Sequence, residues 1–302
     1  MAVGLAGDLR QPGVNGGDAM WMGLGAAVCF GTSDFVLGSL ARSIGVRRAA
    51  FWNQLIGLLA VTMLLCQLPS SKQVFASAPA AAWIAGVAGG LAYLLGSLAL
   101  TRAYSLGAAA IVGPLGNNSG AVATMLSMIN GQIPGAGTLT GAVLCVAGLP
   151  LAARGARSTS TSSTPAALYA TFASVAFGVS LWVQGRWSVP VLGPWLNLWI
   201  AYLVGVPTLI PLLSRLPPKT EAYSRRNIGR LLCVCTLSLC ARGCIAVGLS
   251  IGPTALVAVL SALSGTVTAL LGVLLLRERL TVVQWCGVGV VIAGIVVIHA
   301  SR

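Results

Sequence analysis

The chain has 302 residues, of which 57% are hydrophobic and only 8% charged, with a formal net charge of +13 at pH 7. Soluble globular proteins carry about a quarter charged residues, so this composition excludes that class. The basic residues stand singly or in pairs between apolar runs, which indicates topology signals and no nucleic-acid partner. Because backbone groups in a lipid bilayer must be satisfied within one element, such runs predict an all-α membrane protein.

Ten apolar runs follow one another along the chain, each long enough to cross a hydrocarbon layer of ~30 Å. They come after a flexible N-terminal tail at residues 1–18, which lacks the order of a secretory signal. The predicted transmembrane helices cover residues 19–40, 50–68, 80–101, 107–129, 135–153, 166–186, 191–213, 230–250, 254–276 and 281–299. We therefore expect a multi-pass membrane protein with ten transmembrane helices.

The two halves of the sequence match when one is slid along the other by about 145–147 residues. Gly31 then meets Gly178, one of many identical pairs. We predict a first five-helix repeat at residues 19–153 and a second at 166–299, joined by a flexible Ser/Thr-rich linker at 154–165. Since five is an odd number, the second repeat must enter the membrane from the opposite side, which gives a 5+5 inverted repeat.

Three short motifs frame the two halves. They are Phe30-Gly31-x-Ser33, Phe177-Gly178-x-Ser180, and Glu278-x-Leu280-Thr281-x-x-Gln284-x-x-Gly287 with the later Gly294. With these motifs, residues 20–298 resemble the ten-helix EamA-type members of the drug/metabolite transporter superfamily. The resemblance implies a transporter of the cell membrane and is nearly silent about its substrate.

The chain departs from the family pattern at three points. The first half has Gln132 where the second has Glu278, and predicted helix 9 has Val259 where helix 4 has Pro114. Most basic residues lie in the connections after predicted helices 1, 3, 5, 7 and 9, so the positive-inside rule places both termini outside. The resemblance implies cytosolic termini instead, and the orientation stays open.

Asp34 and Arg242 are an acid and a base deep in predicted helices. Buried charge in lipid is costly, so Asp34 must pair, take up a proton or face a wet cavity. It is a candidate acceptor for a proton or an ammonium group, or a structural partner of Arg42. Arg242 offers a planar fork of donors for a carboxylate or phosphate, or it forms a permanent ion pair with Asp34 or bonds to backbone carbonyls. From the rise of a helix, their depths should differ by about 10 Å.

Predicted helix 4 contains Pro114 followed closely by Asn117 and Asn118. Proline cannot donate to the preceding turn, so we expect a hinge at mid-membrane with two amide side chains beside it. Breaks of this kind line cavities in transporters. A static kink that only helps packing is the alternative interpretation.

Further candidate lining residues are Asn53, near the start of helix 2, and Tyr93 in helix 3. Trp52 could also line the site, although its position is more typical of an interfacial anchor. Cys240 and Cys244 lie one helical turn apart, but without a nearby His we expect no metal site. All cysteines fall in apolar runs and are expected to be packing residues without disulfides.

These features predict a secondary transporter whose halves rock around a central site. One acid and one base suggest that it exports amino acids or similar small polar metabolites, with protons coupled through Asp34. A cationic-drug efflux pump or a lipid-carrier translocase of the same fold is the alternative. The sequence has no Gly-x-x-x-x-Gly-Lys-Ser/Thr loop, so we expect no ATP or other cofactor. It also lacks a nucleophile and base or a metal-ligand set, so we expect no enzymatic activity. Whether the protein forms a homodimer is left open.

Overall fold

The computed structural model describes residues 16–68, 74–106, 109–116, 119–129, 135–153, 163–214, 224–252 and 254–276, with scattered residues between 282 and 297. Within these ranges the chain is helical and no residue lies in a strand, which confirms the all-α prediction. The helices are α1 (Gly16–Ile44), α2 (Val46–Cys66), α4 (Ala80–Leu106), α5 (Ala109–Gly116), α6 (Ser119–Ile129), α7 (Ala136–Ala153), α8 (Ser163–Val183), the π-helical turn η1 (Gln184–Ser188), α9 (Val189–Ser214), α10 (Arg225–Ile251), α11 (Thr254–Ser261) and α12 (Ser264–Leu276).

Several of these helices are long and apolar enough to cross a membrane. In the described part of the chain they are Gly17–Ile44, Val46–Cys66, Ala80–Leu106, Leu168–Leu213 and Arg225–Ile251. The fourth stretch is interrupted at Gly193, whose φ of 74° lies in the left-handed region that glycine adopts without steric cost. The interruption lies beside the boundary predicted between helices 6 and 7. Ten spans and the 5+5 repeat stay predictions, because much of the last predicted helix lies outside the described residues.

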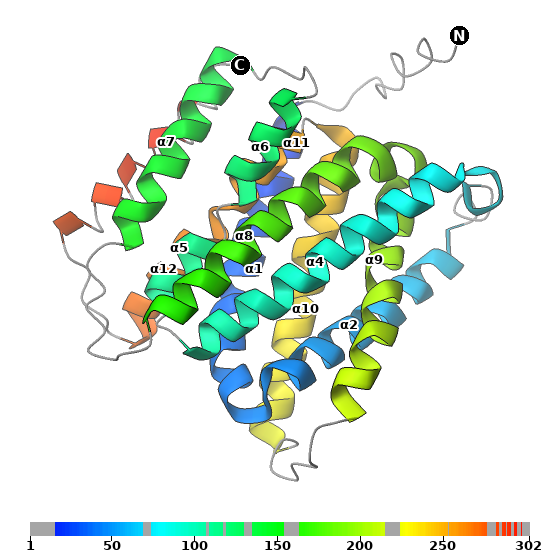
Figure 1. Cartoon of the computed structure of the whole chain (residues 1–302), viewed down its shortest axis with the longest axis horizontal. Helices are drawn as coiled ribbons and strands as arrows, with labels where there is room; N and C mark the ends of the chain where they lie inside the picture. The colour runs from blue at the N-terminus through cyan, green and yellow to red at the C-terminus, as the bar shows by residue number, and fades with distance from the viewer. Residues whose placement is uncertain are drawn as a thin grey trace.

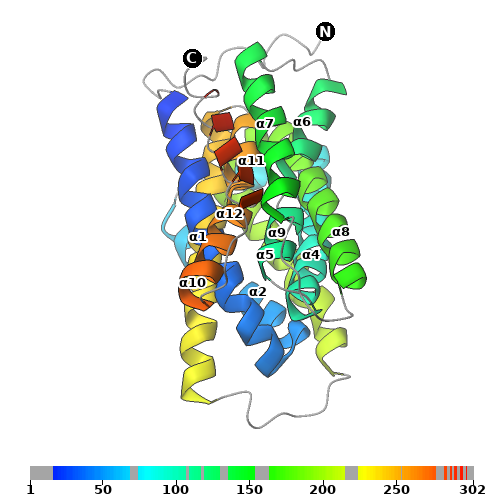
Figure 2. The same cartoon turned by 90° about the vertical axis from the view of Figure 1, so that its left-hand side faces the viewer.

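Helices from the two halves of the chain alternate in the bundle. α1 packs along α10, and α4 packs along α8, and these are the two most extensive helix pairs (Figures 1 and 2). Ser43 on α1 bonds to Asn227 on α10, whereas Ser33 bonds to Ser238, so these helices run antiparallel. By the sequence offset, α1 corresponds to α8 and α4 to α10. The two pairs are therefore equivalent, as a two-fold relation between halves requires.

Two equivalent glycines allow close helix packing at corresponding places. A Cβ atom on Gly31 would lie 2.5 Å from the Cβ of Val267 on α12. A Cβ atom on Gly178 would overlap the Cβ of Val122 on α6. Val122 and Val267 are themselves related by the sequence offset, so the two contacts correspond. The Phe-Gly-x-Ser motifs thus mark where α1 meets α12 and where α8 meets α6.

A helix is interrupted in the second half of the chain. α11 ends two residues after Val259, the residue that corresponds to Pro114 of α5 by the sequence offset. Between α11 and α12 the backbone tightens, with the N–H of Leu263 donating to the carbonyl of Leu260 at 3.2 Å. Proline is therefore not required for the interruption in the second half, which the sequence did not predict.

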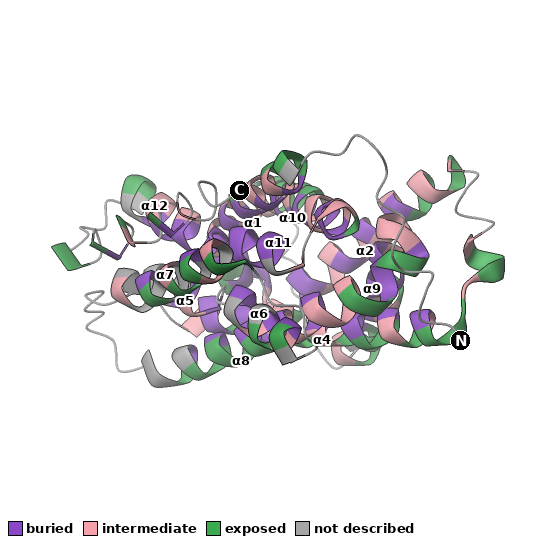
Figure 3. Ribbon diagram, turned by 90° about the horizontal axis from the view of Figure 1, so that it is seen from above, coloured by how far each residue is buried: buried purple, intermediate pink, exposed green. Residues whose placement is uncertain are grey.

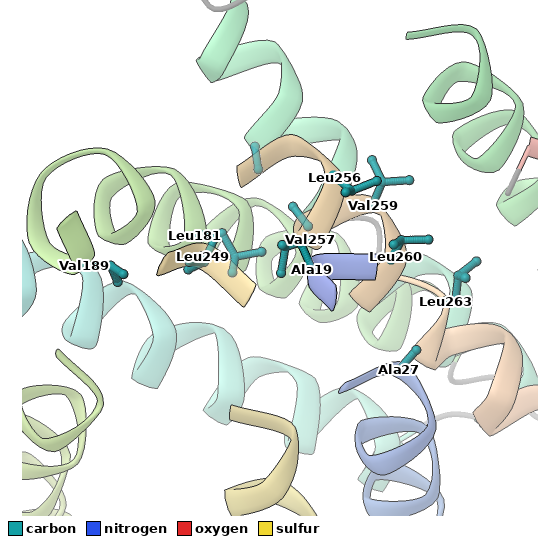
Figure 4. Close-up of a cluster of buried hydrophobic side chains, with 12 residues drawn as sticks. Ala19, Ala27, Leu181, Val189, Leu249, Leu256, Val257, Val259, Leu260 and Leu263 are labelled. Carbon is teal, nitrogen blue, oxygen red and sulfur yellow. The ribbon is translucent and has the colours of Figure 1, made fainter. Parts of the chain in front are cut away.

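The buried residues lie on the helix faces that are turned toward the inside of the bundle (Figure 3). The largest cluster joins α1 to α10 and α11 and includes Ala19, Leu249, Leu256 and Leu260 (Figure 4). Small residues such as Ala19 dominate the α1 side of this cluster. Such residues let helix backbones approach closely, which is how helices associate in lipid.

The outer surface is apolar, whereas several charged and amide groups lie inside. Met63 on α2, Ile84 on α4 and Phe172 on α8 are each more than half exposed. Asp34 and Arg242 are both buried. An outer surface with this many exposed hydrophobic side chains is expected of a protein solvated by lipid.

Candidate functional site

A cavity of about 70 Å³ lies between helices of both halves. Its volume suits a few water molecules and is smaller than ligand pockets of about 300–1,000 Å³. The polar lining residues are Asp34, Asn53, Tyr93, Ser97, Thr101, Ser119, Ser238, Ser261 and Ser264. The apolar lining residues are Phe30, Leu37, Leu100, Phe177, Leu181 and Ile245. The cavity is therefore polar on part of its wall, in the interior of an otherwise apolar bundle.

Asp34 lines this cavity from α1 and is only 7% exposed. The hydroxyl of Tyr104 on α4 donates to Asp34 Oδ2 at 3.3 Å. Arg42, two turns further along α1, donates from Nη1 to the backbone carbonyl of Tyr104 at 3.2 Å. Tyr104 thus connects the buried carboxyl of Asp34 to Arg42 in the last turn of α1.

Arg242 lies beside the cavity wall rather than in its described lining. Its guanidinium carbon is 4.1 Å from the ring centroid of Tyr93 and 3.9 Å from that of Tyr202. Nη1 also donates to Gln54 Oε1 at 3.1 Å. A desolvated cation over an aromatic face is stabilised by about 2 kcal/mol, so the two rings and the amide together hold the buried charge.

Two glycines make room for this arrangement where α2 packs on α9. A Cβ atom on Gly57 would overlap the ring of Tyr202, and one on Gly205 would overlap the side-chain amide of Gln54. Glycine at both positions therefore lets the two contact partners of Arg242 lie between closely packed helices.

The relative depth of the two charges follows from the contact between α1 and α10. The hydroxyls of Ser33 and Ser238 are 2.8 Å apart. Asp34 is the next residue on α1, and Arg242 comes one turn after Ser238 on the antiparallel α10. At ~1.5 Å per residue the charges differ in depth by roughly 7–8 Å, close to the expected separation.

The other candidate residues fall in different places. Asn53 and Tyr93 line the cavity, and Tyr93 packs against Phe177 with 5.2 Å between ring centroids. Trp52 packs edge-on against Phe51 at 5.8 Å and is absent from the described lining. Pro114 lies in α5. The structure therefore brings Asp34, Asn53 and Tyr93 together around one cavity.

The predictions for the two amide residues after Pro114 lie outside the described residues. Asn117 and Asn118 fall between α5 and α6, which end at Gly116 and begin at Ser119. Ser119 itself lines the cavity. Part of the cavity wall therefore comes from the residue directly after this pair.

Sequence reasoning missed three groups around the site. Tyr104 contacts Asp34, and Gln54 and Tyr202 contact Arg242. A signal was available on α4, where Tyr93, Ser97, Thr101 and Tyr104 recur every three to four residues. That spacing places polar side chains on one helical face inside an apolar run.

A second polar network lies where α8 passes into α9. Ser180 Oγ donates to the carbonyl of Gly89 at 2.7 Å, and Gln184 Nε2 donates to Ser180 Oγ at 2.6 Å. Asn197 Nδ2 donates to Gln184 Oε1 at 2.6 Å, while Ser188 Oγ donates to Asn197 Oδ1 at 2.7 Å. The network joins α8, η1 and α9 to α4 at the opposite end of α4 from Tyr104.

The second half of the chain is similar to a known family. Residues 164–300 match the model of the EamA-like transporter family, which confirms the family that the motifs indicated. The chain is also similar to a solved crystal structure, with a TM-score of 0.64 and 19% sequence identity. The match covers 93% of this chain and 96% of the chain in that structure. Similarity at that identity shows a shared fold only. No curated protein matches the sequence.

Proposed function

Since residues 164–300 match the model of the EamA-like transporter family, we propose that the chain is a secondary transporter that exports amino acids or similar small polar metabolites across the cell membrane. The family suggests a membrane transporter of small molecules and a non-enzymatic role. The contacts around the cavity support a substrate class, a coupling ion and alternating access.

The observation that carries this proposal is the shared cavity with Asp34 in its wall. Its lining comes from both halves of the chain, and a buried carboxylate in a membrane protein marks a substrate or ion pathway. A site that both halves build can open to either side when one half tilts against the other. A cavity that both halves line therefore supports the proposal of a transport site.

Equivalent contacts of the two halves support alternating access. The close approaches at Gly31 and Gly178 are the same contact made once by each half. Two arrangements that exchange the environments of the halves would therefore have similar energies, which is the condition for a transporter that visits both.

Proton coupling follows from the chemistry of Asp34. The charged form of a buried carboxyl is costly. Asp34 should therefore release its proton only when water, a cation or a hydrogen-bond donor stabilises the resulting carboxylate. The hydroxyl of Tyr104 is such a donor. Asp34 can then exchange a proton for the positive group of a substrate.

The substrate class follows from the second charge. Arg242 and Asp34 differ in depth by roughly 7–8 Å by helix geometry, so Arg242 would bind the carboxylate of a zwitterion whose ammonium group binds Asp34. Tyr93 covers the guanidinium in this state. Substrate binding at Arg242 therefore requires Tyr93 to move.

A lipid-carrier translocase is the second candidate. It is favoured by the basic end of the bundle, where α1 and α4 end and α2 and α10 begin. Arg42, Arg47, Arg102, Arg225 and Arg226 are all exposed near that end. Guanidinium groups bind phosphate well. A phosphate-bearing lipid would need this rim as well as Arg242, whereas a small zwitterion would need Arg242 alone.

Metabolite uptake into inside-out vesicles tests the proposal, with wild type compared with Asp34→Asn and Arg242→Gln. We expect wild-type vesicles to accumulate one or more amino acids or related metabolites. Uptake by both variants should be lower by a factor of about ten or more. Arg47→Gln, an exposed change at the basic end, is the matched control and should retain uptake. Accumulation by neither wild type nor control vesicles, or full activity of Asp34→Asn, would overturn the proposal.

A further inference from the structure

Two of the hydroxyls that line the cavity have already used their protons. Thr101 Oγ1 donates to the carbonyl of Ser97 at 2.7 Å. Ser261 Oγ donates to the carbonyl of Ala258 at 3.0 Å. A hydroxyl that donates to its own helix has only lone pairs left for a ligand. These two residues therefore offer the cavity acceptors and no donors.

Asn53 adds an acceptor that lacks a donor. Its Oδ1 atom is buried, and among the described residues no donor lies within hydrogen-bond distance of it. Asn53 lines the same cavity as Asp34. An unsatisfied buried carbonyl is costly, so a ligand that supplies an N–H group here gains a hydrogen bond that the empty protein does not make.

Asp34 completes the acceptor set. A carboxylate has about four lone-pair sites, of which the bond from Tyr104 uses one. The nearby cation contributes little to the wall in this state, because the guanidinium of Arg242 stacks on Tyr93 and Tyr202 and is not in the described lining. Asp34, Asn53, Thr101 and Ser261 therefore give the wall a set of acceptors, one of which can be negative.

We propose that this wall is a primary-ammonium subsite, in which Asp34, Asn53 Oδ1 and the hydroxyl oxygens of Thr101 and Ser261 accept the N–H groups of a protonated amine. This subsite rests on the proposed function in one respect, because the amine is part of the transported molecule. A primary ammonium has three donors and a compact charge. A quaternary ammonium of the same charge has no donor and leaves Asn53 Oδ1 unsatisfied.

Two nearly isosteric probes separate these cases. tert-Butylammonium and tetramethylammonium have the same number of heavy atoms and the same charge, but only the first has N–H groups. We would measure their dissociation constants for the purified protein in detergent from tryptophan fluorescence and from the shift in unfolding temperature. Wild type should bind tert-butylammonium about tenfold or more tightly than tetramethylammonium, the range expected for charged hydrogen bonds.

Variants localise this preference to the cavity. Asn53→Leu should reduce the ratio of the two dissociation constants several-fold, while Asn227→Leu, the same change near the start of α10, should leave the ratio unchanged. Should Asn53→Leu fail to fold, Thr101→Val removes another acceptor with little change of shape and should lower the ratio in the same direction. Equal affinities of wild type for the two probes, or an unchanged ratio in a folded cavity variant, would overturn the subsite.

The binding measurement is independent of transport. If no metabolite is transported but tert-butylammonium is preferred, the subsite stands and the proposed function fails. If metabolites are transported and the two probes bind equally, the proposed function stands and the subsite is wrong. The two claims are thus distinguishable in one set of protein preparations.

Discussion

The guanidinium carbon of Arg242 lies 4.1 Å from the ring centroid of Tyr93, and the ring of Tyr93 lines the central cavity. The deepest base of the site is therefore in contact with the cavity wall through an aromatic ring. Arg242 is 5% exposed and its charge is held by the rings and by Gln54. A permanent ion pair is not needed to explain how this charge is buried.

The shape of the cation should matter as much as its charge. Arg242→Lys keeps the charge but loses the planar group that stacks on two rings and donates to Gln54. We expect Arg242→Lys to lose transport nearly as fully as Arg242→Gln, about tenfold or more, in vesicle uptake assays. Wild-type transport by Arg242→Lys would show that only a point charge is required.

The second ring should be replaceable by another aromatic ring. Tyr202→Phe retains a face for Arg242, so we expect transport within about twofold of wild type, whereas Tyr202→Leu should lose about fivefold or more because one cation–π contact disappears. Separate measurement of KM and kcat in proteoliposomes checks this pair. Equal effects of the two substitutions would mean that Tyr202 acts through packing alone.

Asp34 should govern the pH dependence of transport. Wild-type uptake should vary with pH because Asp34 must exchange its proton, and Asp34→Asn should have a lower rate and a flat profile. Tyr104→Phe removes the hydroxyl that donates to Asp34 and should displace the profile without abolishing it. Rates of proteoliposome uptake at a series of pH values provide the measurement. An identical profile in wild type and Asp34→Asn would exclude this carboxyl from coupling.

The paired glycines should be matched in their contribution to stability. Gly31→Ala and Gly178→Ala each place a Cβ against a valine on a facing helix, so each should lower the free energy of unfolding by about 1–3 kcal/mol. Gly229→Ala is the control, because nothing lies within 4 Å of its added Cβ. Thermal unfolding in detergent compares the three.

A second substitution tests whether the clash itself is responsible. Val267→Ala should recover part of the stability that Gly31→Ala loses, since it removes the Cγ1 atom that lies 2.7 Å from the new Cβ and leaves only the Cβ of residue 267 there. If Gly31→Ala and Gly229→Ala are equally stable, α1 and α12 are not packed as closely as described.

Much of this architecture was predictable, because lipid leaves the backbone few choices. The apolar runs define helices, and the offset between halves points to the matched contacts of Gly31 and Gly178. Asp34 could be selected since a carboxyl inside an apolar run has few explanations. The interruption after Val259 was not predictable in this way, because no proline or glycine pair marks that position.

The contacts around Arg242 were also beyond the sequence. Gln54 and Tyr202 lie on α2 and α9, far apart in the chain, and only the packing of these helices brings them to one guanidinium. Trp52 and Asn53 show how neighbours in sequence separate on a helix, since Asn53 lines the cavity while Trp52 packs on Phe51. A one-residue step on a helix turns a side chain by about 100°, which a linear reading does not resolve.

Measuring access to the cavity from the two sides of the membrane tests alternating access most directly. Ser97→Cys would be labelled with a charged, membrane-impermeant thiol reagent after replacement of the eight native cysteines, in right-side-out and inside-out vesicles. Met63→Cys, on the exposed face of α2, is the control that should react from neither side. The account predicts labelling of Ser97→Cys from both sides, with a ratio that changes with pH. Labelling from one side alone, at every pH and with every metabolite, would contradict it.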